Sequence, residues 1–132
     1  MYGQLWPRGP VRFAARNADT GQVIADRVGI AATPVARAIG LLPRATLDRG
    51  EALWIVPSRA VHTWGMRFSI DLIALDADGR VVDAVAAMKP WRLRLPRTGC
   101  VGVLELPAGT LRESETRVGH TVTFEVLSDA CC

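Results

Sequence analysis

The hydrophobic and polar positions of residues 61–82, VHTWGMRFSIDLIALDADGRVV, predict a β-hairpin. A turn at residues 76–79 joins two strand-like runs, residues 67–75 and 80–88. In the first run, the alternate residues that face one side of the strand are apolar, and toward the end of the run the residues on both sides are apolar. We therefore expect that end to be covered on both faces. The last residue of the turn, Gly79, is expected to have a positive φ.

Short apolar runs between turn-forming residues predict further strands, at residues 11–15, 22–30, 52–56, 91–97, 100–106 and 121–127. The last run alternates most regularly. We expect three of its side chains to share one core with Phe68, Ile70 and Leu72, namely Val122, Phe124 and Val126. In WRLRLPR, residues 91–97, apolar side chains alternate with arginines, which predicts a half-buried edge strand with a basic outer face.

Two short helices complete the predicted elements. Thr33 is a suitable N-cap, Pro34 suits the first helical position and Gly40 ends the helix, while residues 107–112 predict a second helical turn. The predicted fold is mainly β, a sandwich or partly closed barrel of about seven or eight short, mostly antiparallel strands with one or two short helices. The expected organisation is an irregular leader, a single β-rich domain and a C-terminal tail, at residues 1–10, 11–127 and 128–132.

Composition narrows the class of protein. A chain of 132 residues, 49% hydrophobic, has the length of one soluble domain, and no apolar run approaches the ~20 residues of a membrane-spanning helix. The net charge of +3 is spread along the chain without a basic block. Three cysteines do not suggest a disulfide framework, and the first residues do not form an intact signal peptide. We expect a cytoplasmic protein, or an exported one if a signal peptide has been removed.

Four stretches, in order, carry a resemblance to a known family: ARAIGLLPR, LDRGEALWIVPSRAVHTWGMRFSIDLIALDADGRVV, PWR and GVLELPAGT. Together they closely resemble the bacterial and archaeal domain of unknown function family number 192, over roughly residues 11–127. The family usually has Pro where this chain has Ser69, and Asp where it has His120. The resemblance implies a compact, mostly β fold of jelly-roll-like character and implies no reaction. Family members that resemble this chain include both cytoplasmic and exported proteins.

Four side chains just before the first strand of the hairpin form a candidate site: His62, Trp64, Met66 and Arg67. Arg67 could clamp an anion, Trp64 could stack on a ligand, and His62 could exchange a proton near neutral pH. We expect Arg67 and His62 to share a partly open pocket with a carboxylate, either Glu105 or Asp71. In the structural alternative, Trp64 and Met66 fill the core and Arg67 pairs with one of these acids.

Glu105 interrupts the apolar run VLEL, and its default position is facing water. If it points inward instead, it requires an arginine partner, because burying an isolated ionised carboxylate is prohibitive. The turn at residues 76–79 lacks the further ligands of a calcium loop, and no spacing of His or Cys suggests a metal site. No serine or cysteine has the surroundings of a catalytic nucleophile.

The sequence thus predicts a non-catalytic binding or accessory module for a small polar or anionic ligand, without metal or cofactor. Its ligand-binding candidates are His62, Trp64, Met66, Arg67, Asp71 and Glu105. One alternative is an enzyme that uses His62 and Glu105 in acid-base chemistry. Another is a structural or protein-interaction module without a ligand. Nucleic acid is a disfavoured partner, because arginines that keep an edge strand from pairing with another chain also explain the WRLRLPR run.

Overall fold

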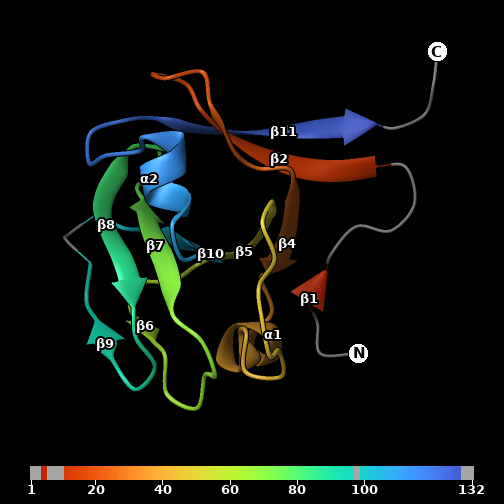
Figure 1. Ribbon diagram of the computed structural model, residues 1–132, viewed down its shortest axis with the longest axis vertical. Helices are drawn as coiled ribbons and strands as arrows, with labels where there is room; N and C mark the ends of the chain where they lie inside the picture. The colour runs from red at the N-terminus through yellow and green to blue at the C-terminus, as the bar shows by residue number, and fades with distance from the viewer. Residues whose placement is uncertain (1–3, 6–10, 97–98, 129–132) are drawn as a thin grey trace.

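The computed structural model describes residues 4–5, 11–96 and 99–128, and its fold is mainly β (Figure 1). The largest sheet has six strands in the order β1-β4-β5-β10-β7-β8. Of its neighbouring pairs, β4 and β5 are parallel and the others are antiparallel. In chain order its strands are β1 (Gln4–Leu5), β4 (Arg27–Ala31), β5 (Glu51–Ile55), β7 (Ile70–Leu75), β8 (Val81–Met88) and β10 (Gly102–Pro107).

Two smaller sheets complete the arrangement. A three-stranded antiparallel sheet has the order β11-β2-β3, and a two-stranded sheet pairs β6 with β9. The described strands form a sandwich-like arrangement that does not close into a barrel. The smaller strands are β2 (Val11–Asn17), β3 (Val23–Ala25), β6 (Val61–His62), β9 (Leu93–Arg94) and β11 (Val122–Ser128).

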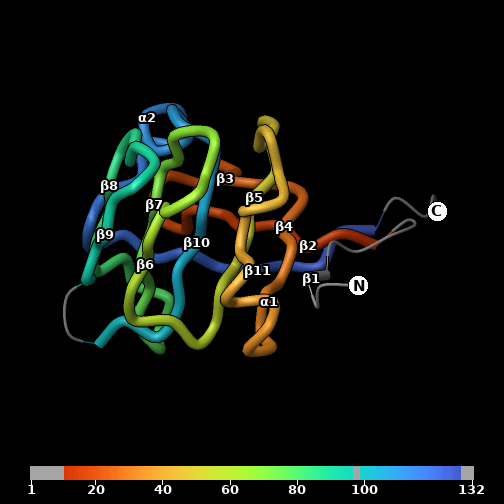
Figure 2. The backbone as a smooth tube through the Cα atoms, turned by 90° about the horizontal axis from the view of Figure 1, so that it is seen from below, coloured from red at the N-terminus to blue at the C-terminus, as the bar shows by residue number. Residues whose placement is uncertain are grey.

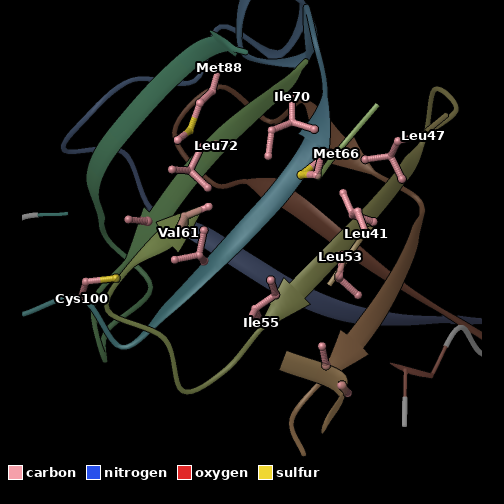
Figure 3. Packing of buried hydrophobic residues seen from close by; sticks show 14 residues of the cluster. Leu41, Leu47, Leu53, Ile55, Val61, Met66, Ile70, Leu72, Met88 and Cys100 are labelled. Carbon is pink, nitrogen blue, oxygen red and sulfur yellow. The ribbon is translucent and has the colours of Figure 1, made fainter. Parts of the chain in front are cut away.

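The six-stranded sheet is buried on both faces, because alternate residues of its central strands enter two different cores. On β7, Ile70 and Leu72 lie in one cluster, while Ile73 and Leu75 lie in the other. Figure 3 shows the side chains of the first cluster gathered over the strands of the sheet. The prediction that this strand is covered on both faces is therefore confirmed.

Different elements cover the two faces. The first cluster includes Leu41, Leu47 and Met66, which come from the loops after α1 (Pro34–Ile39) and after β6. The second includes Leu111 of α2 (Thr110–Ser114) and Val122 of β11. Figure 1 shows β2 and β11 crossing the top of the molecule and α1 at the bottom, and Figure 2 views the same layers from below.

The predicted hairpin and first helix are both present. The antiparallel strands β7 and β8 are joined by a turn in which Gly79 has φ 82°, and the Asp76 carboxylate accepts hydrogen bonds from the backbone of Asp78 and Arg80. At the start of α1, the Thr33 hydroxyl accepts a hydrogen bond of 3.1 Å from the N–H of Ala36. Local turn and cap chemistry was sufficient to predict these features.

Replacing Gly79 with Ala should lower the free energy of unfolding by about 2–3 kcal/mol. Its positive φ already penalises a side chain, and a Cβ there would lie 2.7 Å from the carbonyl oxygen of Val122. Gly21 is a matched control, because it has φ 78° but a Cβ added to it would meet no atom within 4 Å, so Gly21→Ala should cost about 1 kcal/mol. Urea denaturation of both variants checks this, and equal losses would contradict the close approach to Val122.

Two predictions about strand faces are wrong. Val122 is buried, but Phe124 is 42% exposed and Val126 is also exposed, so β11 does not share one core with Ile70 and Leu72. Figure 1 shows the β2–β11 pair extending past the neighbouring strands, and the Phe124 ring, although exposed, packs against the indole of Trp54 with ring centroids 5.0 Å apart. In residues 91–96 the apolar side chains are not half-buried: all three are exposed, Trp91, Leu93 and Leu95.

Some residues of the predicted leader and tail lie in strands. Gln4–Leu5, in the predicted irregular leader, pairs with Ala31 and Ile30 of β4 as the edge strand β1. Ser128, placed in the predicted tail, is the last residue of β11. The rest of the predicted tail, residues 129–132, lies outside the described residues, as do residues 97–98.

Candidate functional site

A cavity of about 600 Å³ lies on the α1 side of the six-stranded sheet. Its walls come from α1 and the loop that follows it, from the end of β5, and from the segment that leads into β6. Apolar side chains provide much of the lining, including Ile39, Leu41, Leu42, Ile55, Val61 and Met66. The polar side chains that line it are Arg37, Ser58, Arg59, His62 and Glu105. The cavity therefore combines an apolar body with a small set of polar groups, as ligand sites do.

Glu105 lies on the wall of this cavity contributed by the sheet. It is in the middle of β10, between Leu53 of β5 and Leu72 of β7, and is only 3% exposed. Its Oε2 atom has no hydrogen-bond partner among the described residues. Burial raises the pKa of the Glu105 carboxyl group from 4.5 to about 8. Near pH 7 this side chain is therefore mainly a neutral carboxylic acid, able to donate one hydrogen bond.

The default prediction for Glu105, facing water, is wrong. An inward carboxylate was expected to require an arginine partner, but no ion pair to Glu105 is present in the part of the chain that the structure describes. Protonation replaces the arginine partner, because a buried carboxyl group that remains neutral avoids the desolvation cost of a charge.

Two arginines bring positive charge to the cavity. Arg37 of α1 donates a hydrogen bond of 3.0 Å from Nη1 to the carbonyl oxygen of Pro57. Its Nε atom is buried and has no partner among the described residues. Arg59, in the loop before β6, also lines the cavity and is exposed. Together these guanidinium groups favour an anionic or oxygen-rich ligand.

His62 lines the cavity, and Trp64, which does not line it, stacks on His62. The imidazole of His62 and the indole of Trp64 have ring centroids 5.0 Å apart and an interplanar angle of 28°. Trp64 itself is exposed. No hydrogen bond joins His62 to Glu105 within the described residues, although both line the same cavity.

Met66 is buried in the cavity lining, whereas Arg67 and Asp71 do not line the cavity. Arg67 is exposed, and no hydrogen bond or ion pair to it is present among the residues described. Asp71 is fully buried and accepts three backbone hydrogen bonds, from Ala87 at 2.8 Å, Gly109 at 3.1 Å and Leu111 at 2.8 Å. The structure thus brings His62, Met66 and Glu105 together at the cavity, with Trp64 stacked beside them.

Sequence reasoning missed Arg37, Ser58 and Arg59. The first lies on a helix and the others follow a proline, and nothing in the local pattern of either segment connects them to Glu105. They meet because α1 and the loop after β5 pack over the same face of the sheet. The one available signal was that Ser58 and Arg59 come directly after a buried strand, in a loop of the kind that often carries binding residues.

Two titratable side chains have structural roles elsewhere. The Nδ1 atom of His120 accepts a hydrogen bond of 3.2 Å from the N–H of Arg117 and lies 3.0 Å from Nδ2 of Asn17. An imidazole in this acceptor role replaces the carboxylate that the family resemblance implies at this position. The buried Cys100 thiol contacts the carbonyl oxygens of Ser58 and Gly102, and burial raises its pKa, which makes it a poor nucleophile.

Comparisons with other proteins agree on one family. The model of DUF192, described as an uncharacterized ACR, matches residues 15–124. A UPF0127 protein of Thermococcus sibiricus is 32% identical over 115 residues, which cover 83% of this chain and 73% of that protein. A UPF0127 protein of Pyrococcus abyssi is 34% identical over 104 residues, covering 74% and 86% of the two chains.

Two solved structures are similar in fold, each with a TM-score of 0.71. A protein of unknown function from Novosphingobium aromaticivorans is 25% identical, with 86% of this chain and 83% of that chain covered. A protein proposed to be a transcription regulator, from Sinorhizobium meliloti 1021, is 21% identical, with 88% and 94% covered. The second likeness concerns the fold alone. None of the helices in the described residues is long and apolar enough to cross a membrane.

Proposed function

This chain belongs to the DUF192 family, a membership that assigns no reaction, and from this premise we propose that it is a non-catalytic binding module. Its ligand is a small polar or anionic molecule held in the cavity between α1 and the six-stranded sheet. The ligand carries at least one oxygen acceptor and an apolar portion. A small organic carboxylate or phosphate ester has this chemistry.

One observation carries the proposal: Glu105 lines the cavity, and its buried Oε2 atom has no partner among the described residues. An unsatisfied polar group of this kind costs about 1–3 kcal/mol, and a ligand oxygen that accepts its proton would recover that cost. Arg37 also lines the cavity, and its buried Nε–H, which has no partner in the described part of the chain, is a second candidate donor. Ile39, Leu42 and Met66 would contact the apolar portion of the ligand.

The enzyme alternative has one observation in its favour, because His62 and Glu105 line the same cavity. In that case a neutral Glu105 would donate a proton and His62 would accept one. The two functions differ in their products. A binding module returns the ligand unchanged after long incubation, and an enzyme does not.

We expect a thermal-shift screen of small carboxylates and phosphate esters to find a stabilising ligand. At 100 times its dissociation constant a ligand stabilises by about 2.7 kcal/mol, a rise in melting temperature on the order of 10 °C. Glu105→Met and Arg37→Met should each reduce this shift, since each removes a donor while keeping most of the side-chain volume.

Arg117→Met is the matched control, because Arg117 is exposed and does not line the cavity. It should leave the ligand-induced shift unchanged. A screen without any stabilising compound would contradict the proposal. So would a ligand whose shift survives both Glu105→Met and Arg37→Met.

A further inference from the structure

The two-stranded sheet of β6 and β9 is a narrow ribbon with two different faces, at the lower left of Figure 1. Its inner face is fixed to the body. Val61 is buried in the first core cluster, and its cross-strand neighbour Arg94 donates two hydrogen bonds, of 2.7 and 2.8 Å, to the carboxylate of Asp83 on β8. This bidentate contact holds β9 against the large sheet.

Thr63 fixes the loops at the end of the ribbon. Its hydroxyl donates a hydrogen bond of 2.6 Å to the carbonyl oxygen of Lys89 and accepts one of 2.9 Å from the N–H of Arg92. Its own carbonyl oxygen accepts hydrogen bonds from Trp91 and Met66. These contacts place residues 63–67 next to residues 89–92, so the side chains of both loops belong to one surface.

The outer side of the ribbon and its loops is apolar and exposed. Four side chains form what we call the ribbon face: Trp64, Trp91, Leu93 and Leu95. Leu93 stands opposite His62 across the ladder, and His62 stacks on Trp64, so His62 connects Leu93 to Trp64. Trp91 is 67% exposed and Leu95 is 70% exposed, so these side chains protrude and do not line a groove. Exposed apolar surface of this kind marks an interaction site.

The two segments that carry the ribbon face have charges of one sign. Residues 52–70 and 84–104 contain no Asp or Glu. Four exposed cations lie on the ribbon loops and the adjoining segment, and none has an acidic partner among the described residues: Arg59, Arg67, Lys89 and Arg92. The fold therefore brings together two segments that contain cations and no acids.

We propose that the ribbon face docks on an anionic membrane surface. Tryptophan favours the boundary between headgroups and acyl chains, leucine favours the acyl side of it, and arginine and lysine bind anionic headgroups. Because the apolar side chains protrude, a fluid bilayer accommodates them without a complementary shape. The absence of acids in both segments removes the repulsion that anionic lipids would otherwise meet.

Vesicle sedimentation tests this docking with the full chain. We expect binding to phosphatidylcholine vesicles that contain phosphatidylglycerol, little binding to phosphatidylcholine alone, and release at high salt. The double variant Leu93→Ser/Leu95→Ser should lose most of the binding. Lys89→Gln and Arg92→Gln should each weaken it about fivefold, as expected for one charge at such a surface. A shift of tryptophan emission to shorter wavelength should accompany binding.

Val118→Ser and Arg117→Gln are the matched controls, one exposed apolar residue and one exposed cation away from the ribbon, and both should bind like the unmodified chain. The absence of binding to both types of vesicle would overturn the proposal. Binding that does not depend on lipid charge, or that persists in the ribbon variants, would also overturn it. A dimer that light scattering detects for the unmodified chain, and that Leu93→Ser/Leu95→Ser converts to a monomer, would also overturn it. The ribbon face would then bind a second copy of the chain.

Discussion

Glu105→Gln should remove a pH dependence of about 1.4 kcal/mol per pH unit from the free energy of unfolding, between pH 4.5 and about 8. In the unfolded chain Glu105 ionises near its ordinary pKa of 4.5, whereas in the folded chain its pKa is about 8. Between these values the folded state holds a proton that the unfolded state has released. The contribution of Glu105 is therefore fully favourable below pH 4.5 and decreases as pH rises toward 8.

Urea denaturation at several pH values measures this effect. Other groups also titrate in the window, so the informative quantity is the difference between the unmodified chain and Glu105→Gln at each pH. Glu115→Gln serves as control, because Glu115 is exposed, and it should leave the slope unchanged. Parallel curves for the unmodified chain and Glu105→Gln would contradict a buried, protonated Glu105.

Asp71→Ala should lower the free energy of unfolding by about 4 kcal/mol. The carboxylate accepts hydrogen bonds from three backbone N–H groups, of Ala87, Gly109 and Leu111, and these connect β8 and the start of α2 to β7. Removing it leaves three donors in a buried region, each costing about 1–3 kcal/mol, with some recovery from water entry. The loss is larger than that of an ordinary surface acid because water does not reach this side chain.

Asp78→Ala provides the comparison for Asp71, since Asp78 is an exposed turn residue. Its substitution should change the free energy of unfolding by less than about 0.5 kcal/mol. Chemical denaturation of both variants under the same conditions gives the two values. A loss below about 1 kcal/mol for Asp71→Ala would mean that the three N–H groups find other acceptors.

Features fixed by local chemistry were predictable from the sequence. The turn before Arg80 depends on Gly79 and on the carboxylate of Asp76, and α1 begins where the Thr33 hydroxyl can cap it. Alternation of apolar residues correctly identified strands but did not determine which face meets a partner. Phe124 and Val126 are on the same side of β11 as the buried Val122, yet both are exposed.

The candidate site was predictable only in part. His62, Met66 and Glu105 do line one cavity, but the cations beside them are Arg37 and Arg59, which arrive from other segments. Arg67 was predicted to share that pocket because it interrupts an apolar pattern, and it instead lies exposed beside the ribbon. The sequence pattern shows only that a charged residue is adjacent to a strand. The packing of loops over the sheet determines which charged side chains line the cavity.

The pairing of β2 with β11 has a consequence for synthesis of the chain. Arg16 on β2 contacts Glu125 on β11, 109 positions later. At ribosomal speeds of about 5–20 residues per second, about 5–20 s pass between the synthesis of β2 and that of β11. One edge of β2 has no partner strand during this time. Throughout that interval its backbone groups are open to pairing with another nascent chain. The three-stranded sheet is therefore the part of this protein for which a chaperone would matter most.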